Sequence, residues 1–224
     1  EIAPSHPVFL MDWTVHNAWV NSRGLELLGI DNVTPDPSGG VIVRDLQTGE
    51  GTGILLDNAA YESRRNLPAY SLQQRSDALD WSIKQIMRFG ITTFKAALIT
   101  TERMEAYVDL RAKGAMPLNV KTSLSWKSAW ANSHEDELAL IAERVNYASD
   151  RMDTNFAKIM LDGIPPTYTA AMLEPYLPSE AFGDHWRGKL MIEPEQLATD
   201  LTELDSRGIT VKIHATGDRS VRAA

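Results

Sequence analysis

From residue 71 onward, segments with helical spacing of apolar residues alternate with short apolar segments, and this alternation restricts the fold more than any other feature. The spacing predicts helices over residues 71–90, 101–113, 133–149 and 193–208. Three of these helices end at a glycine, namely Gly90, Gly114 and Gly208. The segments 91–98, 118–124, 156–163 and 209–218 suit strands. Because each helix is long enough to connect parallel strands, the pattern predicts an α/β fold with a parallel sheet.

The polar residues of the predicted strands favour a barrel over an open doubly wound sheet. In each strand every second residue is apolar, and the residues between them include polar ones. Examples of these polar residues are Lys158, Asp162, Lys212 and His214. A barrel strand packs one face on helices and turns the other to the lumen, where functional groups collect. No G-x-G-x-x-G motif follows any strand, so the dinucleotide fingerprint is absent. We therefore predict a partial (β/α)8 TIM-type barrel with about four βα units, where eight close a barrel.

The first 60 residues have a different character. Residues 16–30 suit a helix that closes near Gly29, and two β-like runs, 41–45 and 52–56, flank a T-G-E-G turn. These features predict a small α/β insertion-like subdomain over 1–60, followed by the partial barrel over 61–224. We favour the interpretation that residues 1–60 form a lid or an addition at the edge of the barrel over a direct part in catalysis.

Composition excludes several classes of partner. The net charge is −8 and the chain contains no cysteine, so it has neither the basic surface that nucleic acid requires nor thiolate zinc ligands or disulfides. No apolar run approaches the roughly 20 residues that span a bilayer. We expect a cytoplasmic protein without nucleic-acid or membrane partners, although the chain begins at Glu1 rather than methionine.

Six blocks of sequence, taken in order, carry a family resemblance. They are HNAWVNSRGLELLGI, TPDPSGGVIVRD, GEGTGILLDNA, GITTFKAA, AKIMLDG and VKIHATGDRSV. Together they resemble the metal-dependent amidohydrolase superfamily, in particular the amidohydrolase family 3 branch that includes N-substituted formamide deformylases. The resemblance implies a barrel with one or two divalent metals, zinc being the first expectation, and hydrolysis of amide or formamide-type C–N bonds in a small-molecule substrate. Residues 1 to about 60 resemble the extra segment between the first and second barrel strands of that family.

The resemblance also implies part of a metal site. The family ligands comprise an H-x-H pair, a carboxylated lysine, two single histidines and an aspartate on successive strands. Lys158 matches the lysine and His214 the fifth-strand histidine, whereas no H-x-H occurs in the chain. A lysine desolvated in a barrel shifts toward the neutral form that can take up carbon dioxide. The resemblance therefore predicts half of a site, and a chain that is inactive alone.

Three further residues are candidates with competing interpretations. Asp162 follows a strand and either acts in catalysis or caps the loop. Lys95 is a candidate substrate-binding residue and a rival for the carboxylated position. His16 precedes the A-W-V-N-S block and could bind substrate from a lid.

Two other classes of function are compatible with the residues. A metal-free barrel hydrolase could use two carboxylates, such as Asp162 and Glu193, if they lie roughly 5 to 9.5 Å apart. A non-catalytic fragment could instead associate as a homo-oligomer through open strand edges at 91–96 and 209–214.

Overall fold

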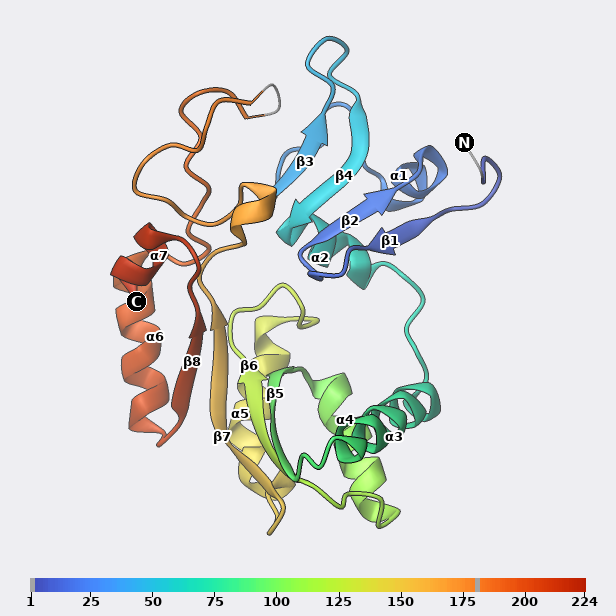
Figure 1. The fold of residues 1–224 in the computed structure, drawn as a ribbon, viewed down its shortest axis with the longest axis vertical. Coiled ribbons are helices and arrows are strands. Elements are labelled where there is room, and N and C mark those ends of the chain that lie inside the picture. Colours follow the sequence, from blue (N-terminus) through green and yellow to red (C-terminus); the bar gives the residue numbers. More distant parts are fainter. Residues whose placement is uncertain (1–2, 180–181) are drawn as a thin grey trace. The chain divides into compact units, whose positions relative to one another are not determined.

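The computed structural model describes residues 3–179 and 182–224, and the chain divides into two compact units. The first unit contains Glu1–Leu67, Met160–Leu197 and His214–Ala224; the second contains Pro68–Ile159 and Ala198–Ile213. Figure 1 shows the elements of both, and each unit is described separately below. The predicted boundary between subdomains 1–60 and 61–224 stays a prediction.

The second unit is built on a four-stranded sheet with strand order β5-β6-β7-β8. β5 and β6 pair in parallel, as do β6 and β7. The strands are β5 (Thr93–Ile99), β6 (Asn119–Ser125), β7 (Met152–Met160) and β8 (Thr210–His214), and the helices are α3 (Leu72–Arg88), α4 (Thr101–Ala112), α5 (His134–Tyr147) and α6 (Pro194–Ser206). The ends of β7, α6 and β8 continue into the first unit. The predicted mixed α/β fold with a parallel sheet is confirmed, whereas closure into a barrel stays a prediction.

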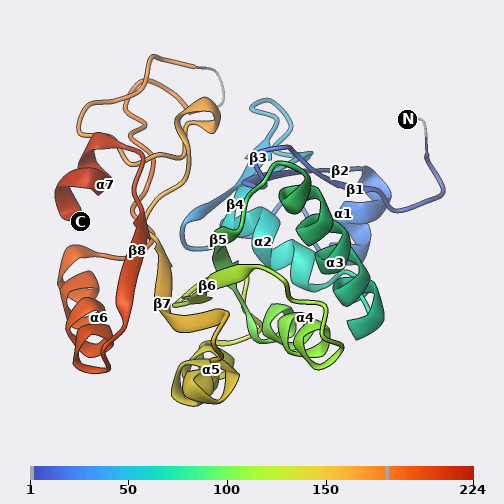
Figure 2. The ribbon, with the colours of Figure 1, turned by 60° about the horizontal axis from the view of Figure 1, so that its bottom comes forward.

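Helix caps and apolar contacts explain why these segments adopt their structure. Ser71 and Gln74 form a capping box at the start of α3, and the Ser133 side chain accepts a hydrogen bond from the Asp136 amide at the start of α5. Helices α4, α5 and α6 lie along one side of the curved sheet (Figure 2). Ile83, Leu110 and Leu118 form a buried cluster between helix and strand residues. Burial of each such side chain contributes about 1.5–3 kcal/mol.

The first unit contains a second, antiparallel sheet with strand order β1-β2-β4-β3. Its strands are β1 (Phe9–Met11), β2 (Asn17–Val20), β3 (Gly40–Arg44) and β4 (Gly51–Asp57), accompanied by α1 (Ser22–Leu28), α2 (Asn58–Arg65), the 3-10 turn η1 (Pro165–Thr167) and α7 (Asp218–Ala223). The predicted hairpin is confirmed as β3 and β4.

The helix predicted over residues 16–30 is wrong in its first part. Strand β2 occupies 17–20, and α1 begins only at Ser22. Ala18 and Val20 are buried while Trp19 is 65% exposed, which is the period-two pattern of a strand. Asn21 then starts the helix, because its side chain accepts a hydrogen bond from the Gly24 amide. The predicted end is correct, since Gly29 adopts the left-handed conformation there.

Over residues 3–179 and 182–224, none of the helices has the length and apolar character needed to cross a bilayer.

Candidate active site

A cluster of buried polar side chains lies in the first unit around His16. Nδ1 of His16 lies 2.6 Å from Oδ1 of Asp57 and 2.9 Å from the hydroxyl of Tyr61. His16 is 8% exposed, and Asp57 and Tyr61 are 1% and 2% exposed. The ring of His214 lies next to the His16 ring, with 5.3 Å between their centroids. Two histidines therefore face each other, and one of them is held by a carboxylate.

Strand pairing explains how residues far apart in sequence form this cluster. β2 and β4 pair antiparallel, with Asn17 opposite Leu56. His16 precedes Asn17 and Asp57 follows Leu56, so the two residues lie opposite each other at the same end of the sheet. The Asp57 amide donates to the His16 carbonyl at 2.7 Å, and Asp57 adopts φ 47°, a left-handed value. Such a backbone costs on the order of 1–3 kcal/mol in a non-glycine residue. Tyr61 reaches the same ring from the first turn of α2.

His214, at the end of β8, is oriented by the loop after β7. Its Nε2 lies 3.0 Å from the Gly163 carbonyl oxygen, which also accepts from the Thr216 hydroxyl at 2.6 Å. Since a carbonyl only accepts, the proton is on Nε2 and the lone pair on Nδ1. Metal-binding histidines commonly donate their other N–H to a carbonyl in this manner.

Asp162 holds the loops after β7 and β8 together. Its carboxylate is fully buried and accepts hydrogen bonds from several donors. Oδ1 accepts from the Thr216 amide, and Oδ2 accepts from the amides of Ala171 and Gly217 and from the Ser220 hydroxyl, at 2.7 to 3.0 Å. Both oxygens are thus engaged by the chain itself. This geometry favours the loop-capping interpretation of Asp162 over direct proton transfer, and its catalytic role stays a prediction.

Gly163 allows the β7 loop to lie close to the His16 cluster. A Cβ atom at this position would lie 2.1 Å from the Thr169 hydroxyl oxygen and 2.3 Å from Oδ2 of Asp57. Both separations are far below van der Waals contact, so a side chain is excluded there without movement. Glycine at 163 therefore lets the backbone approach Asp57 directly.

Lys158 lies in β7 within the second unit. It is 6% exposed, and its Nζ has no hydrogen bond or ion pair to any residue that the structure describes. Burial, with a contribution from the charge of Lys212, lowers the pKa of Lys158 from 10.5 to about 8. The neutral amine is therefore accessible near physiological pH, as both carbamate formation and metal ligation would require.

Lys95 has different surroundings on β5 of the same unit. Its side chain is exposed and lies over the Phe156 ring, with Nζ 4.0 Å from the centroid. Partial burial, then Lys212 and Lys121, lower the pKa of Lys95. Lys158 fits the carboxylated position better because its amine is more completely desolvated.

The described residues do not form a complete metal site. In residues 3–179 and 182–224, no three histidine, aspartate or glutamate side chains are grouped so that they could hold an ion. The donor chemistry of Lys158 and His214 does fit ligand roles, since one amine is easily neutral and one imidazole has its tautomer fixed. Their role as metal ligands stays a prediction.

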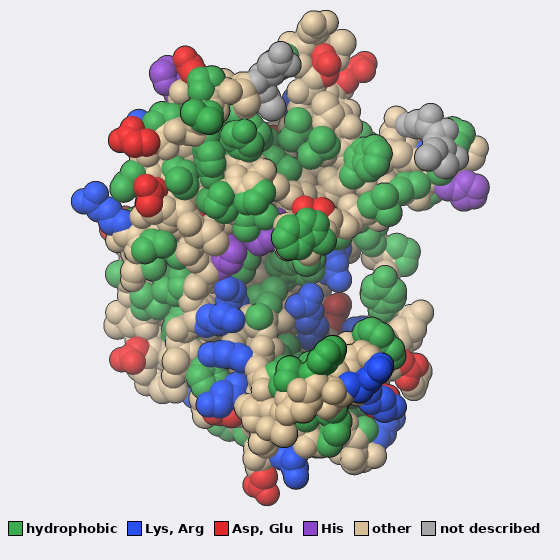
Figure 3. Space-filling view, in the orientation of Figure 1, with side chains coloured by type: hydrophobic (Ala, Val, Ile, Leu, Met, Phe, Trp, Pro, Cys, Tyr) green, Lys and Arg blue, Asp and Glu red, His purple; other side chains and the backbone are tan. Residues whose placement is uncertain are grey.

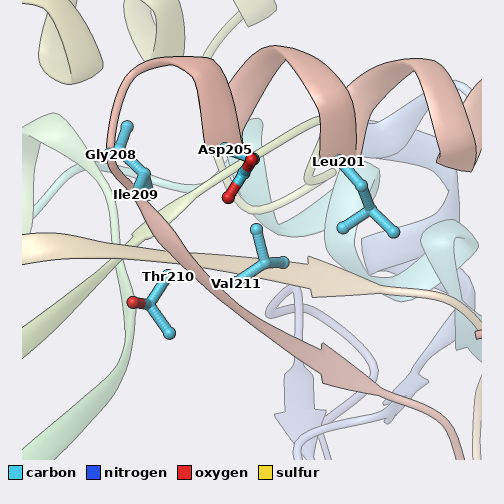
Figure 4. A pocket seen from close by; sticks show the side chains of 6 residues that line it. All are labelled: Leu201, Asp205, Gly208, Ile209, Thr210 and Val211. Atoms are coloured by element: carbon cyan, nitrogen blue, oxygen red, sulfur yellow. The ribbon is translucent and has the colours of Figure 1, made fainter.

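Asp57 and Tyr61 are the site residues that the sequence did not indicate. The signal that could have found Asp57 is its place at the end of an apolar strand, immediately before a helix. A separate depression between α6 and β8 has no histidine or lysine in its lining, which consists of Leu201, Asp205, Gly208, Ile209, Thr210 and Val211 (Figure 4). This depression therefore lacks the residue types of the candidate site.

Comparison with known proteins connects this arrangement to a family. The sequence profile of the amidohydrolase family matches residues 1–224. The chain belongs to the amidohydrolase family. The resemblance inferred from the six sequence blocks is thereby confirmed.

Two relatives and one solved structure define the extent of the match. Protein LONG AFTER FAR-RED 3 of Arabidopsis thaliana is 28% identical over 98% of this amidohydrolase chain and 38% of its own length. N-substituted formamide deformylase of Arthrobacter pascens is 34% identical over 54% of this chain and 23% of its own. An uncharacterized metal-dependent hydrolase from Pyrococcus furiosus has a TM-score of 0.62 at 21% identity, over 99% of this chain and 43% of that one. The structural match shows the fold alone, and the chain spans two fifths or less of the length of the two curated relatives.

Proposed function

We propose that this amidohydrolase chain is part of a metal-dependent enzyme that hydrolyses an amide or formamide-type C–N bond with activated water. The observation that carries the proposal is the family match over residues 1–224. Similarity to an N-substituted formamide deformylase supports the choice of bond. A small amide-like molecule is the substrate class that follows.

Lys158 and His214 are proposed as ligands of a divalent metal, with zinc as the first candidate. The lowered pKa of Lys158 and the Nε2–H donation of His214 to Gly163 support these roles. Such a metal, when bound, lowers the pKa of a coordinated water toward about 7 and polarises a carbonyl. Neutral imidazole is a suitable zinc ligand.

The remaining residues orient the reaction. His16, held through Nδ1 by Asp57, is proposed to present Nε2 to the substrate. Asp162 connects the loops after β7 and β8 through hydrogen bonds and thereby holds His214 in position. A metal-free mechanism with Asp162 and Glu193 gains no support, because the Asp162 oxygens are occupied by backbone and hydroxyl donors. Lys95 remains a proposed substrate-binding residue.

The proposal is tested by metal content and turnover in the full-length protein. Lys158→Ala and His214→Ala should each reduce bound metal and abolish hydrolysis of N-substituted formamides, while Lys84→Ala, a change at a lysine that pairs with Asp80 on α3, should do neither. Turnover that persists in both variants would contradict the assignment. The isolated 224-residue chain should be inactive, because its ligand set is partial.

A further inference from the structure

Three lysines on the β5–β8 sheet form no ion pair with a carboxylate among the residues of the described ranges, although Asp153 is the register partner of Lys121 in β7. Lys95 on β5 and Lys121 on β6 are direct partners in the parallel register, and Lys212 lies on β8. Other lysines of the chain do pair with acids: Lys113 lies 2.6 Å from Asp109, and Lys127 lies 2.7 Å from Asp200. In a chain of net charge −8, unpaired lysines gathered on one sheet need an explanation.

These lysines are close enough to affect one another. The charges of Lys212 and Lys121 both contribute to lowering the pKa of Lys95, with Asp153 acting in the opposite direction. Lys and Arg side chains gather over the strands of this sheet in Figure 3. Mutual repulsion of like charges is unfavourable unless an anion offsets it.

An apolar ring lies beneath this group of lysines. Nζ of Lys95 lies 4.0 Å from the centroid of Phe156, and Nζ of Lys121 lies 5.4 Å from the same centroid. Cation–π contact holds the two amines together over one ring. Two positive charges are thus kept within reach of one small ligand.

We propose that the face formed by Lys95, Lys121, Lys212 and Phe156 binds a small anion that carries a carboxylate or phosphate group. The lysines supply the charge, and the ring contacts the apolar part of the ligand. Lys95 is also the proposed substrate-binding residue, so the inference rests in part on the proposed function, but none of the four residues is a proposed metal ligand, and anion binding is measured without metal or turnover. A divalent cation is excluded by the positive charge.

Ligand-dependent stabilisation tests the proposal in the 224-residue chain. The thermal midpoint is measured with increasing inorganic phosphate and, separately, succinate, at constant ionic strength. Binding to the folded state alone raises the midpoint with ligand concentration. We expect a saturable rise, and a dissociation constant at least roughly tenfold weaker in the double variant Lys95→Gln, Lys121→Gln, as expected when two charge contacts are lost. Lys84→Gln, which removes a lysine paired with Asp80, is the matched control and should bind as the original chain does.

The outcomes distinguish the sources of the anion. A response to phosphate alone identifies phosphorylated ligands, a response to succinate alone identifies carboxylates, and either supports the site. The proposal is overturned if neither probe gives saturable stabilisation, or if the double variant responds as strongly as the original chain. Light scattering measures the molecular mass in parallel. A change in thermal midpoint that arises only because the anion dissociates a multimer would also overturn the proposal. Circular dichroism verifies folding, and Lys212→Gln provides a second variant that should also weaken binding.

Discussion

His16 and Asp57 form a buried pair in which Nδ1 and Oδ1 are 2.6 Å apart. The carboxylate accepts a hydrogen bond from Nδ1–H, which leaves the lone pair on Nε2 and fixes the ring plane. Tyr61 contacts the same nitrogen at 2.9 Å, and the centroid of the His214 ring lies 5.3 Å from that of the His16 ring. Asp57 is therefore a positioning residue for the imidazole that the sequence had indicated as a substrate-binding group.

Replacement of Asp57 should destabilise the first unit. Asp57→Ala leaves the buried imidazole without its acceptor, and we expect a loss of about 1–3 kcal/mol in the free energy of unfolding. Asp57→Asn, which keeps the shape and one acceptor oxygen, should lose less. Urea unfolding measures both, and Asp184→Ala is the control because that side chain is 72% exposed. Equal stability of the alanine variant and the original chain would show that the pair contributes nothing.

Addition of a single methyl group at Gly163 should disturb the same region. In Gly163→Ala the new Cβ would lie 2.1 Å from the Thr169 hydroxyl and 2.3 Å from the Asp57 carboxylate. We expect a destabilisation of about 1–3 kcal/mol, the usual cost of overpacking. Gly51→Ala is the matched control, since its Cβ would approach only Leu25, at an ordinary 3.6 Å. Thermal unfolding of the two variants would contradict the prediction if their midpoints coincide.

Removal of the Asp162 carboxylate should release the loops after β7 and β8. Asp162→Ala leaves the amides of Ala171, Thr216 and Gly217 without an acceptor, and each buried donor left unpaired costs about 1–3 kcal/mol. Native-state hydrogen exchange should show faster exchange at these three amides. Asp162→Asn retains one carbonyl oxygen and should preserve part of the protection. If the exchange rates in the alanine variant are unchanged, the loop-capping role of Asp162 is contradicted and a catalytic role is favoured instead.

The lowered pKa of Lys158 predicts how stability depends on pH in metal-free protein. Between about pH 8, the folded value, and the unfolded value near 10.4, the unfolded chain binds a proton at Lys158 that the folded chain does not. Stability contributed by this residue therefore rises with pH through that window, with a slope approaching about 1.4 kcal/mol per pH unit.

Chemical denaturation at several pH values in the presence of a chelator measures this slope. Lys158→Met should remove the rise, because the variant has no group that titrates at this position. Lys84→Met should retain it, since the Lys84 side chain is 66% exposed. A slope that is the same in the chain and in Lys158→Met would contradict burial as the cause of the low pKa.

The local order of helices and strands could be predicted from the sequence because it depends on periodicity and caps within short windows. Ser71 and Ser133 mark helix starts, and Gly208 follows the last turn of α6. The same local reasoning failed at Asn17–Val20, where pairing with β1 and β4 outweighed a helical pattern. The partners of β2 in β4 lie 35 to 39 residues further along the chain, from Trp19 opposite Ile54 to Asn17 opposite Leu56, and no local window contains them.

The sequence by itself determined the α/β alternation, the family, and the positions of Lys158 and His214 in ordered motifs. Only the tertiary structure decided that Asp57 and Tyr61 hold His16, and that Asp162 is saturated by loop amides. It also decided that Lys95, Lys121 and Lys212 share a sheet, where none of them forms an ion pair with another described residue. The physical reason is that burial, hydrogen-bond satisfaction and charge proximity are properties of residues brought together by the fold, whereas sequence patterns report only the tendencies of neighbours along the chain.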